Sequence, residues 1–389
     1  MSRSIAYALN VFPSDTLEEL DASLAGPAAR LRERAAVRGA PLPVELRLGL
    51  PAIEAATRGG RAGAIRERLA ASGLRCVSVN GFPLSPFHAR RVKEDVFRPS
   101  WLDEERVRAT LDLAAIAAEL SDGADETTLS TLAGSFKLWG DGEDVRRAAA
   151  ANLRRAADGL EELAARTGKR VTLCVEPEPF TTFETLPEIL DLFVRTGPHP
   201  RLAVTLDCSH QAVQFEEPAA WIRALAERGV RLGKLHVTHA LSIRGPAGNA
   251  AGVAALRRLR EDRWLHQTIC ASGTVVTRRA SDIPDLDAPG AAARSFGGAD
   301  EARVHFHLPL FLESGDGFST THAWTREALR LAWSGTGCEH FVVETYTWPV
   351  LEGRGVVEGS SGAAREDALV DSMAKELDWA RRAVGEGAP

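Results

Sequence analysis

The stretch RTGKRVTLCVEPEP, residues 166–179, contains the signals that decide the fold of this chain. A helical segment ends at Thr167-Gly168, because glycine readily adopts the left-handed conformation that closes a helix. The run VTLCVE, residues 171–176, is short, apolar and rich in Val and Leu, which is typical of a buried strand. It ends in the carboxylate of Glu176. The stretch therefore predicts a helix, a tight turn and a strand with a polar end.

The same order of helix, glycine and strand recurs along the chain, for example at Ser72-Gly73 and Arg228-Gly229. We predict eight strands, at residues 5–11, 44–50, 75–79, 127–131, 171–176, 202–207, 231–237 and 340–344. Eight helical stretches alternate with them, at residues 16–36, 61–72, 103–120, 143–166, 186–195, 218–228, 324–333 and 365–384. Alternation predicts a parallel sheet, and the number eight favours a closed (β/α)8 barrel. No GxGxxG motif follows the first strand, which disfavours an open dinucleotide-binding sheet.

The chain is longer than a barrel requires. A bare barrel takes about 250 residues, and this chain has 389. We expect all 389 residues to form one barrel domain, with an insertion at 241–322 that covers the C-terminal face as a lid. Two extended runs lie inside the insertion, at 264–271 and 303–311. Gly-, Pro-, Ala- and Arg-rich patches at 244–251 and 280–298 predict mobile loops.

The composition limits the classes of protein to which the chain can belong. It has 47 Lys and Arg against 53 Asp and Glu, a net charge of −6, whereas nucleic-acid binders usually carry a basic surplus. No apolar run approaches the roughly 18–20 residues that span a bilayer. The N-terminus has no signal-peptide pattern, and the five cysteines are widely spaced. We therefore expect a cytoplasmic protein without a nucleic-acid partner or a transmembrane segment.

Charged side chains stand at the ends of four consecutive predicted strands. Glu176 ends the fifth strand, and Asp207 with nearby His210 ends the sixth. His236 lies in the seventh strand and Glu344 ends the eighth. Barrels of this kind have their active sites at the carboxyl ends of the strands, so these groups should converge. Because grouped charges beside an apolar core are costly unless they bind a cation, the set predicts a divalent metal: Mn, Zn, Fe, Co or Mg.

Each of these residues also has a structural interpretation. Glu176 alone is compatible with a helix cap, and Asp207 with His210 is compatible with an N-cap beside a surface imidazole. His236 alone is compatible with a core histidine, and Glu344 with an ion pair to arginine. Their joint placement at successive strand ends favours the metal site.

A second group of candidates lies in the insertion and in nearby loops. Strand periodicity puts His305 and His307 on one face and Phe306 on the other. With His88 and Glu178, these histidines are candidates for a second metal or for substrate contact. The alternative is an insertion strand that carries solvated histidines.

Further residues after strands are candidates for substrate binding. Lys93, Ser135 and Lys137 would hold an anion or a hydroxyl group, and Tyr346 would form part of an apolar wall. Each is also compatible with a surface position or with packing. The catalytic candidates are Glu176, Glu344 and Lys137.

These residues resemble the motifs of a known superfamily. The run EPEP at 176–179, the run DCSH at 207–210, His236 and Glu344 resemble the metal site of the xylose isomerase-like barrels. That superfamily includes sugar isomerases, ketose 3-epimerases, inosose dehydratases and endonuclease IV. The resemblance implies a TIM barrel whose metal ligands are Glu176, Asp207, His236 and Glu344. It also implies that His210 is the imidazole that holds another metal in endonuclease IV-like sites.

Longer motifs resemble one family in particular, the EboE-like metabolite traffic proteins. These motifs are NGFP at 80–83, FH at 87–88, GSFK at 134–137, HFHLP at 305–309 and ETYTW at 344–348. The resemblance implies a role in making or moving a small metabolite, in a pathway whose other members resemble a sugar-phosphate cyclase and a prenyltransferase.

The sequence departs from the superfamily pattern at two places. The run LSTL at 129–132 lacks the histidine that a trinuclear endonuclease site has after the fourth strand. The spacing after Glu176 does not reproduce the second catalytic glutamate of the epimerases, and Glu178 and Glu184 are alternatives for it.

Three functions are open at this point. The first is a metal-dependent isomerase, epimerase or dehydratase acting on a small polyol, sugar or cyclitol-like substrate. The second is a phosphoesterase with two or three metals, of the endonuclease IV-like type. The third is a barrel that binds a metabolite without catalysis. Metal count separates the first two hypotheses.

Overall fold

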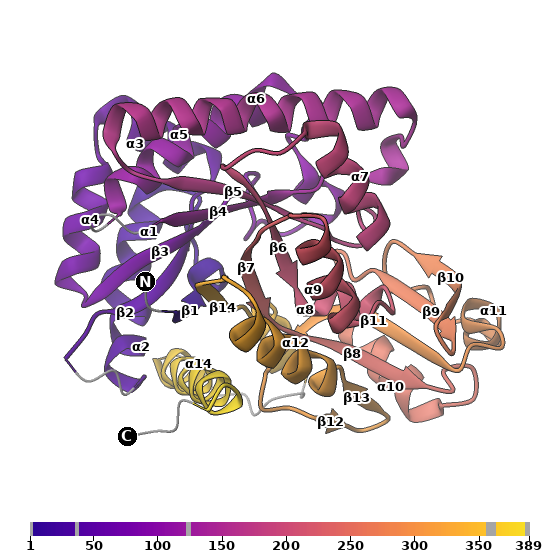
Figure 1. The fold of residues 1–389 in the computed structure, drawn as a ribbon. Coiled ribbons are helices and arrows are strands. Elements are labelled where there is room, and N and C mark those ends of the chain that lie inside the picture. The colour runs from indigo at the N-terminus through magenta and orange to yellow at the C-terminus, as the bar shows by residue number, and fades with distance from the viewer. Residues whose placement is uncertain (1–2, 36–38, 122–125, 355–362, 386–389) are drawn as a thin grey trace.

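The computed structural model describes residues 3–35, 39–121, 126–354 and 363–385. Eight parallel strands close into a barrel in the order β1-β14-β7-β6-β5-β4-β3-β2 (Figure 1). They are β1 (Ser4–Ala8), β2 (Leu42–Arg47), β3 (Leu74–Asn80), β4 (Thr127–Leu132), β5 (Val171–Glu176), β6 (Leu202–Asp207), β7 (Leu232–Val237) and β14 (His340–Val343). This confirms the predicted (β/α)8 barrel with a long insertion between its seventh and eighth strands.

Helices surround the barrel. They are α1 (Leu17–Ser23), α2 (Ala29–Arg34), α3 (Leu50–Gly59), α4 (Ala62–Ala71), α5 (Glu104–Leu120), α6 (Glu143–Thr167), α7 (Leu186–Thr196), α8 (Cys208–Val213), α9 (Pro218–Glu227), α12 (His322–Gly335), α13 (Trp348–Gly353) and α14 (Ala363–Ala383). Each long helix buries one apolar face. In α6, Leu153, Ala156 and Leu160 recur at helical spacing and are fully buried, on a helix that contacts α5, α7 and β5.

The helix predicted at 16–36 is present from Leu17 to Arg34, but it is not a regular α-helix throughout. It runs from α1 through a π-helical turn over Leu24–Ala28 into α2. Pro27 lies in that turn, and proline has no N–H to continue the hydrogen bonds of an α-helix.

The insertion forms a second, antiparallel sheet with the order β10-β9-β11-β8-β13-β12. Its strands are β8 (His239–Arg244), β9 (Thr268–Ser272), β10 (Val275–Ala280), β11 (Glu301–Leu308), β12 (Ser314–Gly315) and β13 (Phe318–Thr320). The sheet has an apolar core of its own, in which Leu241, Leu256 and Phe306 are fully buried. Strands β8 and β11 contact α8, the short helix directly after β6. The insertion therefore lies beside the carboxyl ends of the barrel strands (Figure 1).

Of the two patches predicted as loops in the insertion, the first is a turn as far as Asn249, whereas the second contains a helix. Helix α10 (Ala250–Leu259) follows the first patch, and α11 (Ala291–Phe296) lies within the second. The side chain of Asn249 accepts a hydrogen bond from Gly252 N and caps α10. The buried Leu256 and Phe296 then anchor the helices in the core of the insertion. The glycine and alanine content of these patches carried more weight in the loop prediction than the capping Asn249 and the apolar Leu256 and Phe296.

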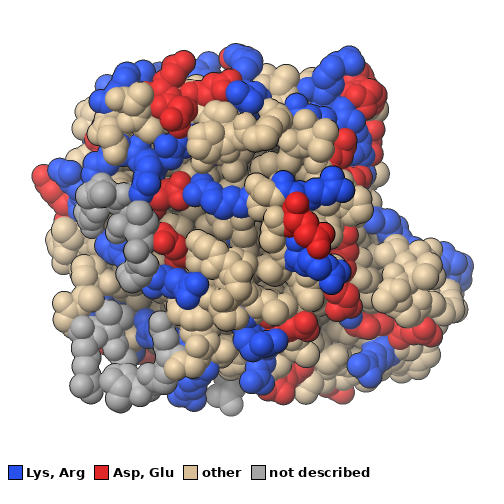
Figure 2. Space-filling model, viewed as in Figure 1, with Lys and Arg blue, Asp and Glu red and all other residues tan. Residues whose placement is uncertain are grey.

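The surface charge and the character of the helices can also be compared with the sequence-based expectations. Basic and acidic side chains are interspersed over the face shown in Figure 2. Of the helices in the described part of the chain, none combines the length and the apolar character needed to cross a membrane.

Candidate metal centre

Four side chains meet where β5, β6, β7 and β14 end. Nδ1 of His236 lies 2.9 Å from Oε1 of Glu176, 3.2 Å from Oε2 of Glu344 and 3.6 Å from Oδ2 of Asp207. The register of β6 and β7 places Asp207 beside His236. All four side chains are buried, and one ligand atom from each lies within 4.8 Å of the others. This group, here called the four-residue centre, can hold a metal ion.

The ring of His236 is oriented by a carboxylate inside the barrel. Its Nε2 lies 3.2 Å from Oε1 of Glu45, a fully buried residue of β2. Glu45 also accepts a hydrogen bond of 2.6 Å from Ser78 Oγ and is paired with the ammonium group of the buried Lys234. Carboxylates therefore face both ring nitrogens, and they hold the pKa of His236 well above its usual range. A metal ion in the four-residue centre would displace the hydrogen on Nδ1, while Nε2 keeps its hydrogen toward Glu45. Metal-binding histidines are usually oriented in this way.

The donor set of the four-residue centre fits a cation. Oε2 of Glu176 and Oδ2 of Asp207 are buried and have no hydrogen-bond partner among the described residues. Burial raises the pKa of Glu344 to about 8, and the nearby carboxylates Glu176 and Asp207 add to the increase. Three carboxylates around one imidazole are costly in an apolar barrel, and a divalent cation offsets that cost.

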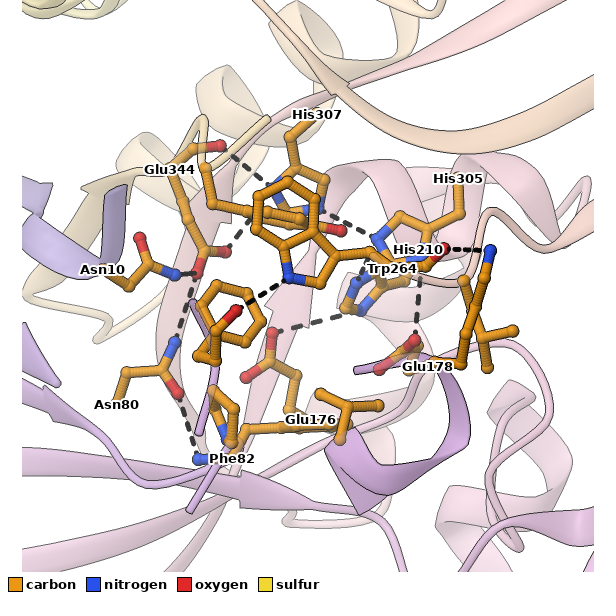
Figure 3. A pocket seen from close by; sticks show the side chains of 16 residues that line it. Asn10, Asn80, Phe82, Glu176, Glu178, His210, Trp264, His305, His307 and Glu344 are labelled. Carbon is orange, nitrogen blue, oxygen red and sulfur yellow. Dashed lines mark hydrogen bonds and ion pairs between the residues drawn. The ribbon is translucent and has the colours of Figure 1, made fainter. Parts of the chain in front are cut away.

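Three histidines form a second group at the same end of the barrel. His210 comes from α8, and His305 and His307 come from β11 of the insertion (Figure 3). Nε2 of His305 lies 3.1 Å from Nε2 of both His210 and His307. Phe306, between the two strand histidines, points away and stacks on the ring of His266 with centroids 4.0 Å apart. We call this group the three-histidine centre.

In the three-histidine centre, each ring has its Nδ1 beside an oxygen that can accept a hydrogen bond. These oxygens are Pro177 O for His210 at 3.2 Å, Gln267 Oε1 for His305 at 2.7 Å and Glu344 O for His307 at 3.1 Å. The Gln267 amide is oriented by its own N–H group, which donates to Glu178 Oε1 at 2.5 Å. The hydrogen of each neutral ring therefore belongs on Nδ1, which leaves the lone pair on Nε2.

The three Nε2 lone pairs thus point toward one another in a buried space. Burial lowers the pKa of His307 to about 3 and holds the pKa of His305 well below its usual range. These rings are therefore neutral near pH 7. Lone pairs on neutral rings repel one another when they converge, and a cation between them removes that repulsion. The three-histidine centre therefore also fits a metal ion. Asp207 lies between the two centres, with its carboxylate oxygens 3.9 Å from Nε2 of His210 and of His307.

Two asparagines that the sequence analysis did not consider contact the four-residue centre. Asn10 and Asn80 donate side-chain hydrogen bonds of 2.6 and 3.2 Å to Oε1 of Glu344. Asn80 is the last residue of β3, so the strand-end rule applied to amides would have found it. Asn10 lies in a 3₁₀ turn, Leu9–Val11, inside the segment predicted to continue the first strand.

Lys93 lines the cavity above these centres, but its charge is already paired. Its Nζ lies 2.6 Å from Oδ2 of Asp282 and donates to the carbonyls of Glu261 and Trp264 at 2.8 Å each. The backbone N–H groups of Val92 and Lys93 donate to Arg263 O. Lys93 therefore joins the loop after β3 to the insertion.

Three other candidates lie outside the cavity lining. The ammonium of Lys137 binds Glu184 and Glu188 at 2.7 and 2.8 Å. Ser135 is buried, and its backbone bonds with Thr182. His88 Nε2 donates to Asn10 O at 2.9 Å. The structure does not bring Lys137, Ser135 or His88 to either centre, whereas Glu178 and Tyr346 line the cavity.

The fold and this centre define a class: (β/α)8 barrels that gather acidic and histidine side chains at the carboxyl ends of their strands. The profile of the xylose isomerase-like TIM barrel family matches residues 44–263, more than half of the chain, so the protein belongs to that family.

Solved structures agree with this fold. An L-ribulose 3-epimerase superimposes with a TM-score of 0.50 at 14% identity, over 98% of this chain and 96% of that one. A D-allulose 3-epimerase from Methylomonas sp. superimposes with a TM-score of 0.52 at 14% identity, over 98% of this chain and 99% of the other. A search of curated protein sequences gave no match. At this identity the likeness supports the fold alone.

Proposed function

We propose that this protein is a metal-dependent isomerase, epimerase or dehydratase that acts on a sugar- or cyclitol-like head group. The four-residue centre carries the proposal, because its buried Glu176 and Asp207 oxygens lack hydrogen-bond partners and Nδ1 of His236 lies among its carboxylates. The epimerases that share the fold act on ketoses by name, which supports the same substrate class here.

The residues would divide the chemistry as follows. Glu176, Asp207, His236 and Glu344 would hold a divalent ion: Mn, Zn, Fe, Co or Mg. Such an ion polarises a carbonyl and acidifies the neighbouring C–H group. Glu178 lines the cavity, and burial holds its pKa well above the usual range, so it is suited to give or take a proton. Asn10 and Asn80 would orient Glu344. The insertion would act as a lid that limits water at the cavity.

The first experiment is metal analysis of protein purified without chelator. We expect bound metal in the wild type and loss of it in Asp207→Ala, because the variant removes a ligand that lies between both centres. Asp316→Ala, at an exposed position of the insertion, is the matched control and should retain the metal. A wild-type protein that binds no divalent metal would contradict the proposal.

The second experiment tests the reaction class. Metal-loaded protein is incubated in D₂O with a panel of ketoses and inososes, and ¹H NMR follows loss of the C–H signal beside the carbonyl. Exchange that disappears in Glu178→Gln supports proton transfer by that residue. Metal binding without exchange or turnover of any compound would instead favour a metabolite-binding barrel.

A phosphoesterase is the second candidate, and the three-histidine centre is the observation that favours it. Two metals near Asp207 would suit displacement at phosphorus. A metal ratio of two or more that falls by one in His307→Ala, but not in His322→Ala, would support a two-metal site. Hydrolysis of p-nitrophenyl phosphate by the wild type and not by His307→Ala would then favour this candidate.

The motifs that resemble the EboE-like family would place either activity in a small-metabolite pathway. Genes beside the one for this chain that resemble a cyclase and a prenyltransferase would support that placement.

A further inference from the structure

The cavity in front of the metal centres has two unlike walls. One wall is formed by the carboxylates and imidazoles already described. The other is made of carbon-rich side chains: Phe82, Phe87, Val96, Trp264, Leu265 and Tyr346. Figure 3 shows Trp264 and Phe82 facing the polar residues across the site.

The aromatic part of the second wall is a closed cluster. The ring centroids of Phe87, Trp264 and Tyr346 lie 5.0–5.4 Å apart, and the three side chains are buried. The indole N–H of Trp264 donates to Phe87 O at 3.2 Å, so it is not available to a ligand. The wall therefore offers a ligand mostly carbon surface, with the Tyr346 hydroxyl as the polar group of the three rings.

The lining offers no free positive charge. Lys93 is the one Lys or Arg among the described residues that line the cavity, and its three N–H donors already have three acceptors. One amide N–H of Asn10 and one of Asn80 donate to Glu344, and an amide carries no charge. A phosphate or carboxylate on the far side of a substrate would find no cationic partner there.

A simple polyol would also be a poor match. Hydroxyls that lie against this wall would find the Tyr346 hydroxyl as the polar group of its three rings, and a polar group buried without a partner weakens binding. An apolar group in the same place gains from burial.

We infer that the substrate joins an oxygen-rich head group, which meets the metal centres, to an uncharged apolar or aromatic group that packs on Phe87, Trp264 and Tyr346. This inference rests on the proposed function, because the head group needs the metal. It adds that the preferred substrate is neither a bare sugar nor a sugar phosphate.

The test measures binding to Mn²⁺-loaded protein by calorimetry. Acetohydroxamic acid and benzohydroxamic acid present the same pair of metal-binding oxygens, but only the second carries an apolar ring. We expect benzohydroxamic acid to bind about tenfold tighter or more, because its ring is buried against the aromatic wall. A carboxylate at the para position of the ring should abolish most of that gain.

Variants test whether the tighter binding of benzohydroxamic acid comes from the aromatic wall. Trp264→Leu should reduce the preference for benzohydroxamic acid and leave the affinity for acetohydroxamic acid within about twofold of the wild type. Phe82→Leu is a second variant in case Trp264→Leu does not fold. Equal affinities for the two hydroxamates in metal-loaded wild type would overturn the inference while the proposed function stands. Protein that retains no Mn²⁺ would overturn the proposed function and the inference together.

Discussion

Glu45 shows how single residues beneath the four-residue centre control it. It is fully buried, it lies 3.2 Å from Nε2 of His236, and Lys234 neutralises its charge. Burial raises the pKa of Glu45, but Lys234 and His236 outweigh that effect and lower it, so the carboxylate is ionised near pH 7. An ionised acceptor at Nε2 makes Nδ1 of His236 a stronger metal ligand.

We therefore predict that Glu45→Gln weakens metal binding by about 10- to 100-fold. Competition with a fluorescent chelator would measure the change. Because the variant leaves the charge of Lys234 buried and unpaired, the double variant Glu45→Gln/Lys234→Met is the control. It should regain thermal stability but not metal affinity. Unchanged affinity in both variants would show that Glu45 has no role in orienting His236.

The limits of sequence analysis are also clearest at single residues. Glu176, Asp207, His236 and Glu344 were predictable because parallel strands deliver their carboxyl ends to one rim. Glu45 was not, because it lies within β2, two residues before that strand ends. Lys93 and Lys137 were predicted to hold an anion or a hydroxyl group of the substrate. Sequence alone does not reveal that Asp282 and Glu184, 189 and 47 residues away, pair with them.

At the scale of elements, α14 is connected to the barrel by one buried carboxyl group. Glu376 of α14 accepts hydrogen bonds from Tyr7 Oη at 2.5 Å, from Thr345 Oγ1 at 2.8 Å and from Leu310 N at 3.0 Å. It thus joins β1, the segment after β14 and the segment after β11. Burial raises the pKa of Glu376 to about 7, although these hydrogen bonds oppose the change.

A carboxyl group whose pKa is higher in the folded chain stabilises the fold at low pH and loses that contribution as pH rises through its folded value. We predict that the free energy of unfolding falls by about 2 kcal/mol between pH 5 and pH 8 through this group. Urea unfolding of the wild type and Glu376→Gln across that range would test it. The variant should lack this part of the pH dependence, and identical slopes in both proteins would contradict the assignment.

Most elements were predictable for a simple reason. The periodicity of strands and helices and the glycines between them gave all eight barrel strands within a few residues, since local pattern and burial agree there. The antiparallel sheet of the insertion was harder, because its strands pair across long separations. For example, Glu301 of β11 pairs with Arg244 of β8. Only the runs at 264–271 and 303–311 indicated that strands were present.

For the whole molecule, the metal centres should contribute to stability. A ligand that binds only the folded chain stabilises it by about 2.7 kcal/mol at a concentration 100 times its dissociation constant. We predict that EDTA lowers the melting temperature by several degrees and that Mn²⁺ or Zn²⁺ restores it. Differential scanning calorimetry measures the change. Asp207→Ala should melt at the same temperature with or without EDTA, and a wild type insensitive to EDTA would argue against buried metal sites.

The three-histidine centre takes two of its rings from β11 and one from α8, so it joins the insertion to the barrel. An ion that binds His210, His305 and His307 together also stabilises the packing of the insertion against the barrel. By thermodynamic linkage, that packing strengthens binding of the ion to the same extent. Metal should therefore slow amide hydrogen exchange throughout β8, β9 and β11, many residues beyond the ligands themselves. Any movement of the insertion away from the barrel to admit substrate would separate these three rings, and an ion bound between them would oppose that movement.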